Sequence, residues 1–239
     1  VFPLTFDLDR MGKIGSPFAF DAEAGAYIGV LERDAPVSEI RWIEAPVCFV
    51  FHYLNAWNEG HQITFDAIDF SVAPNFPDPD GNFPGHAEAQ GRLTRWKVNA
   101  ASGQIDRELL VDVPAEFPRI DDRFAMGRHR HGFLATASQR KRGDGGIFHE
   151  ITHIDLETGQ QQVWEAGYGS GVSEPVFVER FQQADEGAGW LLATFYEPER
   201  HTSSLVVLDA MAVADGPVAT VRLDHRVPFG FHGSWRPAS

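Results

Sequence analysis

The chain of 239 residues is poor in several features, and each scarcity excludes a class of protein. Its one cysteine, Cys48, excludes an internal disulfide and any site built on several thiolates, and it suits a reducing cytoplasm. No apolar run approaches the roughly 18 residues that a membrane-spanning helix needs. Lysine and arginine number 20 against 34 acidic residues, a net charge of −14, which disfavours nucleic acid or an anionic membrane as partner. We therefore expect a cytoplasmic protein with no membrane span and no nucleic-acid partner.

The beginning of the chain lacks the features of a natural N-terminus. There is no methionine at position 1 and no signal-peptide pattern. Residues 1–6 have the composition of the middle of a strand. This predicts that the sequence is a fragment.

Long helical periodicity is absent, whereas short strand patterns are frequent. Residues 47–51, 191–196 and 205–208 are rich in β-branched and aromatic side chains. The 23 glycines and 15 prolines divide the chain into short pieces, with turn clusters such as residues 78–82 between them. The sequence predicts an all-β protein.

Three segments repeat one pattern, a strand, a short polar turn that contains glycine, and a second strand. They are residues 96–104, 153–160 and 206–216, and equivalent positions are about 55 residues apart. This period is typical of β-propeller blades with four short strands each. At about 50 residues a blade, the chain holds four to five blades. An all-β sandwich is the alternative that the same pattern allows.

Ten histidines make imidazole the first candidate for a metal ligand. His149 and His153 match the zinc-protease pattern HExxH, which requires a helix to place both rings on one face. Here the pattern continues into a strand and the turn at residues 156–159. Four residues of a strand span about 13 Å, too far for two imidazoles to share a zinc ion. We therefore reject a zinc site there.

His129 and His131 have the spacing that would place them on one face of a strand, where they could chelate a metal. However, Arg128 and Arg130 flank them and add positive charge. The sequence favours a solvated basic hairpin.

His52 and His232 differ from the others because each lies in an apolar, aromatic run that predicts a strand. For each alone, a hydrogen-bonded core histidine is the ordinary interpretation. They are 180 residues apart, so a shared site requires a fold that brings distant strands to one axis. The inner strands of a propeller do this.

Glu116 and Glu174 are likewise unusual, because each carboxylate lies among apolar residues. A metal-bound histidine commonly donates its second ring N–H to a carboxylate, which fixes the tautomer. The alternative is an ordinary ion pair, for example between Glu116 and Arg119. If the metal interpretation holds, Glu116 should lie beside His52 and Glu174 beside His232.

Four segments, taken together and in this order, resemble the carotenoid cleavage oxygenase family, most closely its bacterial lignostilbene dioxygenase-like branch. The family implies a seven-bladed propeller with Fe(II) on its axis, bound by four histidines, three of which are oriented by glutamates. By this resemblance His52 is the third ligand and His232 the fourth, with Glu116 and Glu174 as two of the three glutamates. The segments are residues 51–59, 115–120, 173–178 and 227–235.

The remaining family ligands have no counterpart here. Two histidines and one glutamate should precede Val1, so the resemblance implies that residues 1–239 are the C-terminal part of a single propeller domain. A fragment of this kind is expected to be inactive alone.

The resemblance implies cleavage of a conjugated C=C bond in a stilbenoid or (apo)carotenoid, with O2 as co-substrate and two carbonyl products. The apolar substrate would lie against Phe51, Phe231 and Trp235, which are candidates because they neighbour the two histidines in the sequence. Two other classes stay open, a metal-free propeller that only binds a partner and a glycoside hydrolase that works through two carboxylates.

Overall fold

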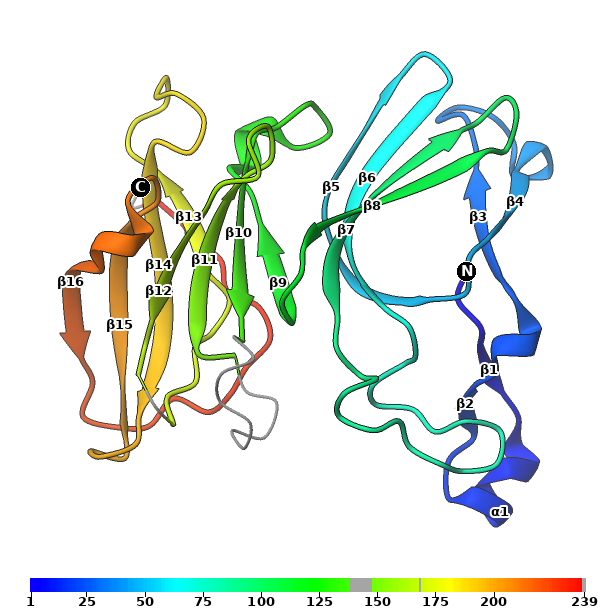
Figure 1. The fold of residues 1–239 in the computed structure, drawn as a ribbon, viewed down its shortest axis with the longest axis horizontal. Helices are drawn as coiled ribbons and strands as arrows, with labels where there is room; N and C mark the ends of the chain where they lie inside the picture. The colour runs from blue at the N-terminus through cyan, green and yellow to red at the C-terminus, as the bar shows by residue number, and fades with distance from the viewer. Residues whose placement is uncertain (138–147, 168, 238–239) are drawn as a thin grey trace.

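The computed structural model describes residues 1–137, 148–167 and 169–237, and it confirms an all-β fold (Figure 1). Strands in the described residues form three four-stranded antiparallel sheets and two two-stranded ones. Each four-stranded sheet takes its strands in sequence order, as in a propeller blade. Of the four to five blades expected from the repeat, the described residues form three as four-stranded sheets, and the two smaller sheets have two strands each.

The five sheets are formed by strands that are close together in the sequence. The small sheets pair β1 (Leu4–Phe6) with β2 (Phe18–Phe20), and β3 (Ala26–Val30) with β4 (Arg41–Ala45). The first large sheet contains β5 (Phe49–Glu59), β6 (Gln62–Phe70), β7 (Arg92–Asn99) and β8 (Ile105–Val111). The second contains β9 (Ala115–Arg119), β10 (His131–Thr136), β11 (Glu150–Asp155) and β12 (Gln161–Glu165). The third contains β13 (Val176–Glu179), β14 (Gly189–Glu197), β15 (Thr202–Asp209) and β16 (Pro217–Arg222).

Helices in the described residues are short. They are α1 (Met11–Ile14) and the 3-10 helices Leu8–Arg10, Ala22–Ala24, Val37–Glu39, Asp122–Phe124 and Val213–Asp215. Within this part of the chain, no helix is long and apolar enough to cross a lipid bilayer.

The sequence repeat corresponds to the last hairpin of each large sheet, where the third strand turns into the fourth. Asn99, Asp155 and Asp209 end β7, β11 and β15. The side-chain oxygens of Asn99 and Asp155 each accept hydrogen bonds from the backbone N–H groups two and three residues on, and that of Asp209 accepts one from the residue two positions on. Gly103 and Gly159 then adopt positive φ angles of 81° and 73°, which glycine tolerates best. The repeat is thus a turn that Asn or Asp starts and glycine completes.

The middle large sheet packs on both of its neighbours, which explains its continuous apolar strands. All six residues of β10 are buried. Leu134 packs into the cluster shared with the first sheet, whereas Phe133 and Ala135 pack into the cluster shared with the third. Because side chains alternate along a strand, one strand can serve two cores.

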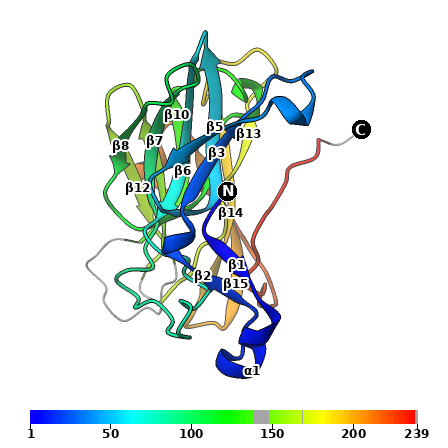
Figure 2. The same ribbon diagram turned by 90° about the vertical axis from the view of Figure 1, so that its right-hand side faces the viewer.

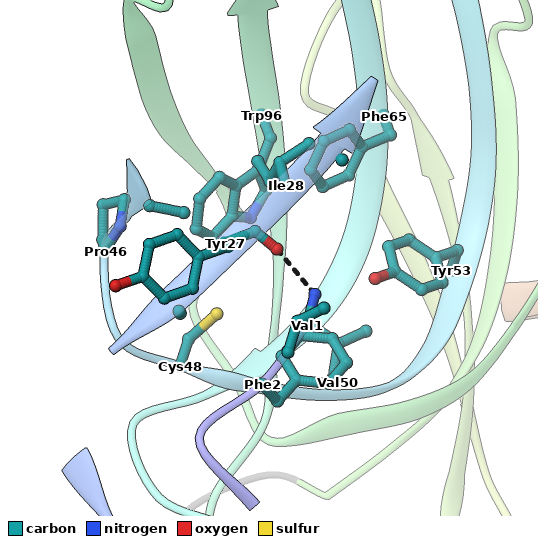
Figure 3. A pocket seen from close by; sticks show the side chains of 13 residues that line it. Val1, Phe2, Tyr27, Ile28, Pro46, Cys48, Val50, Tyr53, Phe65 and Trp96 are labelled. Carbon is teal, nitrogen blue, oxygen red and sulfur yellow. Dashed lines mark hydrogen bonds between the residues drawn. The ribbon is translucent and has the colours of Figure 1, made fainter. Parts of the chain in front are cut away.

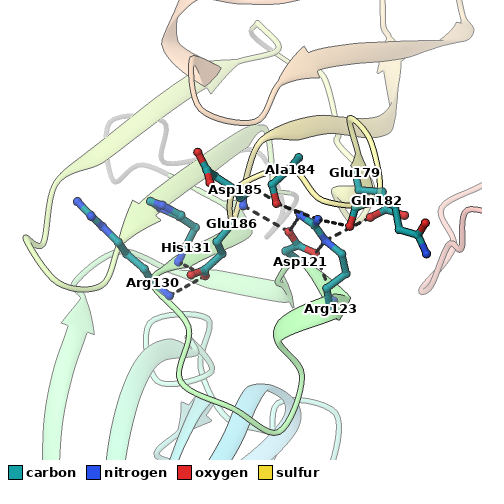
Figure 4. A network of polar contacts seen from close by, with 10 residues as sticks. Asp121, Arg123, Arg130, His131, Glu179, Gln182, Ala184, Asp185 and Glu186 are labelled. Carbon is teal, nitrogen blue, oxygen red and sulfur yellow. Dashed lines mark hydrogen bonds and ion pairs between the residues drawn. The ribbon is translucent and has the colours of Figure 1, made fainter.

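Polar contacts also connect the second and third sheets, between the β9–β10 loop and the β13–β14 loop (Figure 4). The Arg123 guanidinium binds Asp121 and donates to the Ala184 carbonyl over 2.9 Å. Glu186 accepts the backbone N–H groups of Arg130 (2.6 Å) and His131 (2.9 Å). Charged side chains therefore hold one loop against the neighbouring sheet.

Candidate metal centre

His52 lies on β5, the first strand of the first large sheet. The β5–β6 register shifts on either side of Tyr53, so the ladder is irregular beside the histidine. Such bulges redirect side chains. The His52 side chain is one-quarter exposed.

His232 lies where the sequence did not place it. We expected a strand, but residues 223–237 contain no strand or helix, and the chain runs over the surface after β16 (Figure 2). The structure nevertheless brings the two histidines together. Their Nε2 atoms are 3.1 Å apart, and the ring planes meet at 80°.

A buried glutamate backs each imidazole. Glu116, on β9, places Oε2 2.5 Å from His52 Nδ1. Glu174, in the irregular segment before β13 rather than in a strand, places Oε1 3.2 Å from His232 Nδ1. The two residues are only 6% and 5% exposed. The pairing expected from the sequence, Glu116 with His52 and Glu174 with His232, is the one that the structure shows.

Each carboxylate favours a proton on the ring nitrogen that faces it. A carboxylate accepts, so in a neutral imidazole that donates to it through Nδ1 the Nε2 atom carries the lone pair. With both rings in that tautomer, two lone pairs face one another over 3.1 Å, an arrangement that a cation between them stabilises. Two nitrogens at about 2.1 Å from one metal are at most about 4.2 Å apart, and the observed 3.1 Å lies within that limit. The donor set therefore fits a metal that prefers imidazole.

The carboxylates differ in their surroundings. Burial raises the pKa of Glu116, opposed by the Phe117 backbone N–H and by His52. Glu174 has a cation nearby instead, with Arg119 Nη1 3.4 Å from Oε2. The alternative pairing of Arg119 with Glu116 is therefore not what the structure shows. Among the described residues, no group of three or more His, Cys, Asp or Glu side chains is arranged to hold a metal.

Two further pairs of histidines were singled out in the sequence, and the expectation was correct for one pair and wrong for the other. The HExxH pattern begins at His149, just before β11, and continues along that strand without forming a helix, which agrees with its rejection as a zinc site. The solvated hairpin was wrong, because His129 and His131 are 8% and 7% exposed. Arg128 pairs with Glu59 and Arg130 with Asp155, so the flanking charges are neutralised while the imidazoles are buried.

Phe117 is the site residue that the sequence analysis missed. Its ring centroid lies 5.6 Å from that of His52 and 6.1 Å from that of His232. Its φ angle is 53°, in the left-handed region that bulky residues rarely adopt. The only signal in the sequence was its position next to Glu116.

Of the three aromatic residues expected to contact substrate, Phe51 lies near the histidine pair. Phe51 is 38% exposed, and its ring centroid is 6.2 Å from that of His52. Phe231 and Trp235, on the C-terminal segment, are 74% and 53% exposed. Their role stays a prediction.

A separate apolar pocket of about 250 Å³ lies between the β3–β4 hairpin and the first large sheet (Figure 3). Tyr27, Phe65 and Trp96 line it, together with Tyr53, the residue that follows His52. Neither histidine of the pair lines this pocket. It is distinct from the candidate metal centre.

Known proteins similar to this chain share its sequence over nearly its whole length. An isoeugenol monooxygenase of Pseudomonas nitroreducens is 37% identical over 99% of the chain, and a lignostilbene-alpha,beta-dioxygenase isozyme III of Sphingomonas paucimobilis is 34% identical over all of it. The chain spans about half the length of these relatives, 52% in both cases.

A solved structure and a family model agree with these relatives. The lignostilbene dioxygenase of Pseudomonas brassicacearum superposes on 100% of the chain and 52% of its own length, with a TM-score of 0.91 and 30% identity. The model of the retinal pigment epithelial membrane protein family matches residues 1–237. Because that match covers nearly every residue, including both histidines and both glutamates of the candidate site, the chain belongs to the family of the retinal pigment epithelial membrane protein and the carotenoid cleavage oxygenases.

Proposed function

We propose that this chain is part of a non-haem Fe(II) dioxygenase that cleaves a conjugated C=C bond. The observation that carries the proposal is the 3.1 Å separation of two imidazole nitrogens, each backed by a buried carboxylate. His52 and His232 would hold the iron, and Glu116 and Glu174 would keep their Nε2 atoms free to bind it. Neutral imidazoles suit Fe(II), and bound iron would supply the activation of O2.

The proposed reaction needs no further cofactor. One C=C bond and the O–O bond are broken and two C=O bonds form, so O2 accounts for all the oxygen atoms and all the electrons. The chain's own histidines would bind the iron, and its glutamates would orient the two imidazoles. We assign no side chain as proton donor or acceptor.

The substrate class is proposed from the relatives. Isoeugenol and lignostilbenes both carry an aromatic ring conjugated to a C=C bond, so an aryl-substituted alkene is favoured over a long polyene. Phe51, Phe231 and Trp235 are proposed to contact it, and Phe117, whose ring lies beside both imidazoles, is proposed as a further contact. A cytoplasmic location, expected from the single cysteine, is part of the same proposal.

These 239 residues alone are expected to be inactive. His52 and His232 would supply half of the imidazoles that the family implies, and a metal site that lacks ligands binds weakly. We therefore propose that the chain by itself holds iron weakly and cleaves no alkene.

The geometry weighs against the two other classes. In a glycoside hydrolase, Glu116 and Glu174 would face a sugar, but both are buried and hydrogen-bonded to histidines. In a binding module without a metal, the two Nε2 atoms, 3.1 Å apart, would have to share a proton instead of a metal ion.

The test uses the protein expressed from its complete reading frame. His52→Ala and His232→Ala are each expected to reduce the iron content and to abolish O2-dependent formation of aldehydes, whereas His61→Ala, at an exposed histidine, should leave both unchanged. Reaction under ¹⁸O2 should label both products. Full iron content in either site variant would contradict the metal centre, and label in one product alone would contradict a dioxygenase.

A further inference from the structure

The backbone of His232 has little support from secondary structure. Near the start of the C-terminal segment, Ser203 bonds the backbones of Leu223, His225 and Val227. Beyond Val227, the backbone hydrogen bonds to other described residues are those of Gly233. The position of His232 therefore depends on the residue that follows it.

Two charged side chains hold Gly233 from both sides. Its N–H donates to Glu174 Oε2 over 2.8 Å, and its carbonyl accepts from Arg119 Nη1 over 3.4 Å. A side chain at Gly233 would begin 3.0 Å from Val176 Cγ2, so the segment lies close against β13. Arg119 and Glu174 thus fix the peptide units next to His232.

Arg119 is suited to this position by charge and by shape. Its side chain is 21% exposed, and Nη1 is 3.4 Å from the buried Glu174 carboxylate while Nη2 is 3.5 Å from Asp122. The several N–H groups of a guanidinium can serve a carboxylate and a carbonyl at once, which a lysine ammonium does less well. Glu116 Oε1, by contrast, has no hydrogen-bond partner among the described residues.

We propose that Arg119 is a positioning residue for His232. It holds the Gly233 carbonyl and the Glu174 carboxylate, and through them it keeps the imidazole facing His52. Arg119 itself contacts no metal or substrate. The inference rests on the proposed function, because it takes His232 to be a metal ligand.

The experiment uses the protein from its complete reading frame, first without metal and then with Co²⁺ as the probe. In Arg119→Gln, hydrogen–deuterium exchange in peptides covering residues 228–237 should become at least tenfold faster, and Co²⁺ affinity should fall about 10- to 100-fold. Arg119→Lys should be intermediate. Asp122→Asn, which removes only the exposed partner of Arg119, should match the wild type in both measurements.

Four results would overturn the claims or separate them from one another. Wild-type exchange and wild-type Co²⁺ affinity in Arg119→Gln would overturn the role of Arg119. Equal acceleration in all peptides, including those of β14 and β15, would show a general effect on stability and would also overturn it. Undiminished Co²⁺ affinity in His52→Ala would contradict the proposed metal centre, whereas loss of Co²⁺ in His52→Ala with no effect of Arg119→Gln would contradict only the present inference.

Discussion

The backbone N–H of Phe117 donates to the carboxylate of its own neighbour, Glu116, over 2.6 Å. The same carboxylate oxygen contacts His52 Nδ1. One oxygen atom therefore orients the imidazole of His52 and accepts the backbone N–H of Phe117. Strand β9 has one extra residue here relative to β10, between the pairs Glu116–Ala135 and Arg119–Phe133. This bulge accommodates the left-handed backbone of Phe117.

The strain at Phe117 predicts an unusual order of stability. Because its φ angle is 53°, Phe117→Gly should be more stable than Phe117→Ala by about 1 kcal/mol, the reverse of the usual order in a strand. Urea unfolding of the two variants measures the difference. A more stable alanine variant would show that the backbone is not strained at this position.

Removal of charge from Glu116 should weaken metal binding without removing a ligand. Glu116→Gln keeps an oxygen for the two N–H donors but loses the negative charge, so Co²⁺ affinity should fall about 10- to 100-fold. Titration of the protein from its complete reading frame measures this. Glu108→Gln, at an exposed acid paired with Lys97, is the matched control. Equal affinities for the two variants would argue against a role for Glu116 in orienting His52.

The stability of the protein should decrease on acidification because of His153. Burial, with a contribution from neighbouring His131, lowers the pKa of His153 to about 4. In the unfolded chain the pKa is about 6.5, so between these values the unfolded state takes up a proton that the folded state does not. The stabilisation is present above pH about 6.5 and is lost as the pH falls to about 4, on the order of 3 kcal/mol in total.

Urea unfolding at several pH values tests this prediction. His153→Gln should flatten the decrease in the free energy of unfolding between pH 7 and pH 4. His61→Gln, at an exposed histidine, should keep the wild-type slope. An unchanged slope in His153→Gln would assign the acid sensitivity to other groups.

The contact between the second and third sheets should depend on Glu186. In Glu186→Ala, the backbone N–H groups of Arg130 and His131 lose a charged acceptor, which should cost about 1–2 kcal/mol and speed hydrogen exchange in residues 180–188. Glu157→Ala removes another, more exposed acid near Arg130 and should cost less. Equal costs would mean that the two backbone contacts contribute little.

Much of the fold followed from local patterns. The turn that starts at Asn99, Asp155 or Asp209 recurs because an Asx side chain and a glycine form the same turn wherever they occur. The HExxH pattern was correctly assigned to a strand because its neighbours favour a strand and a turn. The residue types that flank the HExxH pattern were sufficient for that conclusion.

Burial was harder to predict where charges compensate at long range. The sequence places Arg128 and Arg130 beside His129 and His131 but does not show that Glu59 and Asp155 pair with those arginines. Likewise, Arg119 is nearer in sequence to Glu116, yet it contacts Glu174. Ion pairs depend on distance in space, so neighbours in sequence were a poor guide.

The amino-acid sequence by itself determined the all-β repeat, the family resemblance and the four residues of the candidate site, because these depend on residue types and on local periodicity. The tertiary structure alone decided that His52 and His232, 180 residues apart, bring their nitrogens within 3.1 Å of one another. It also decided that His232 is held by side-chain contacts and not by a strand, and that Phe117 lies beside both rings. The physical reason is that these contacts join distant segments, and only the packing of the sheets around a common axis sets their separation.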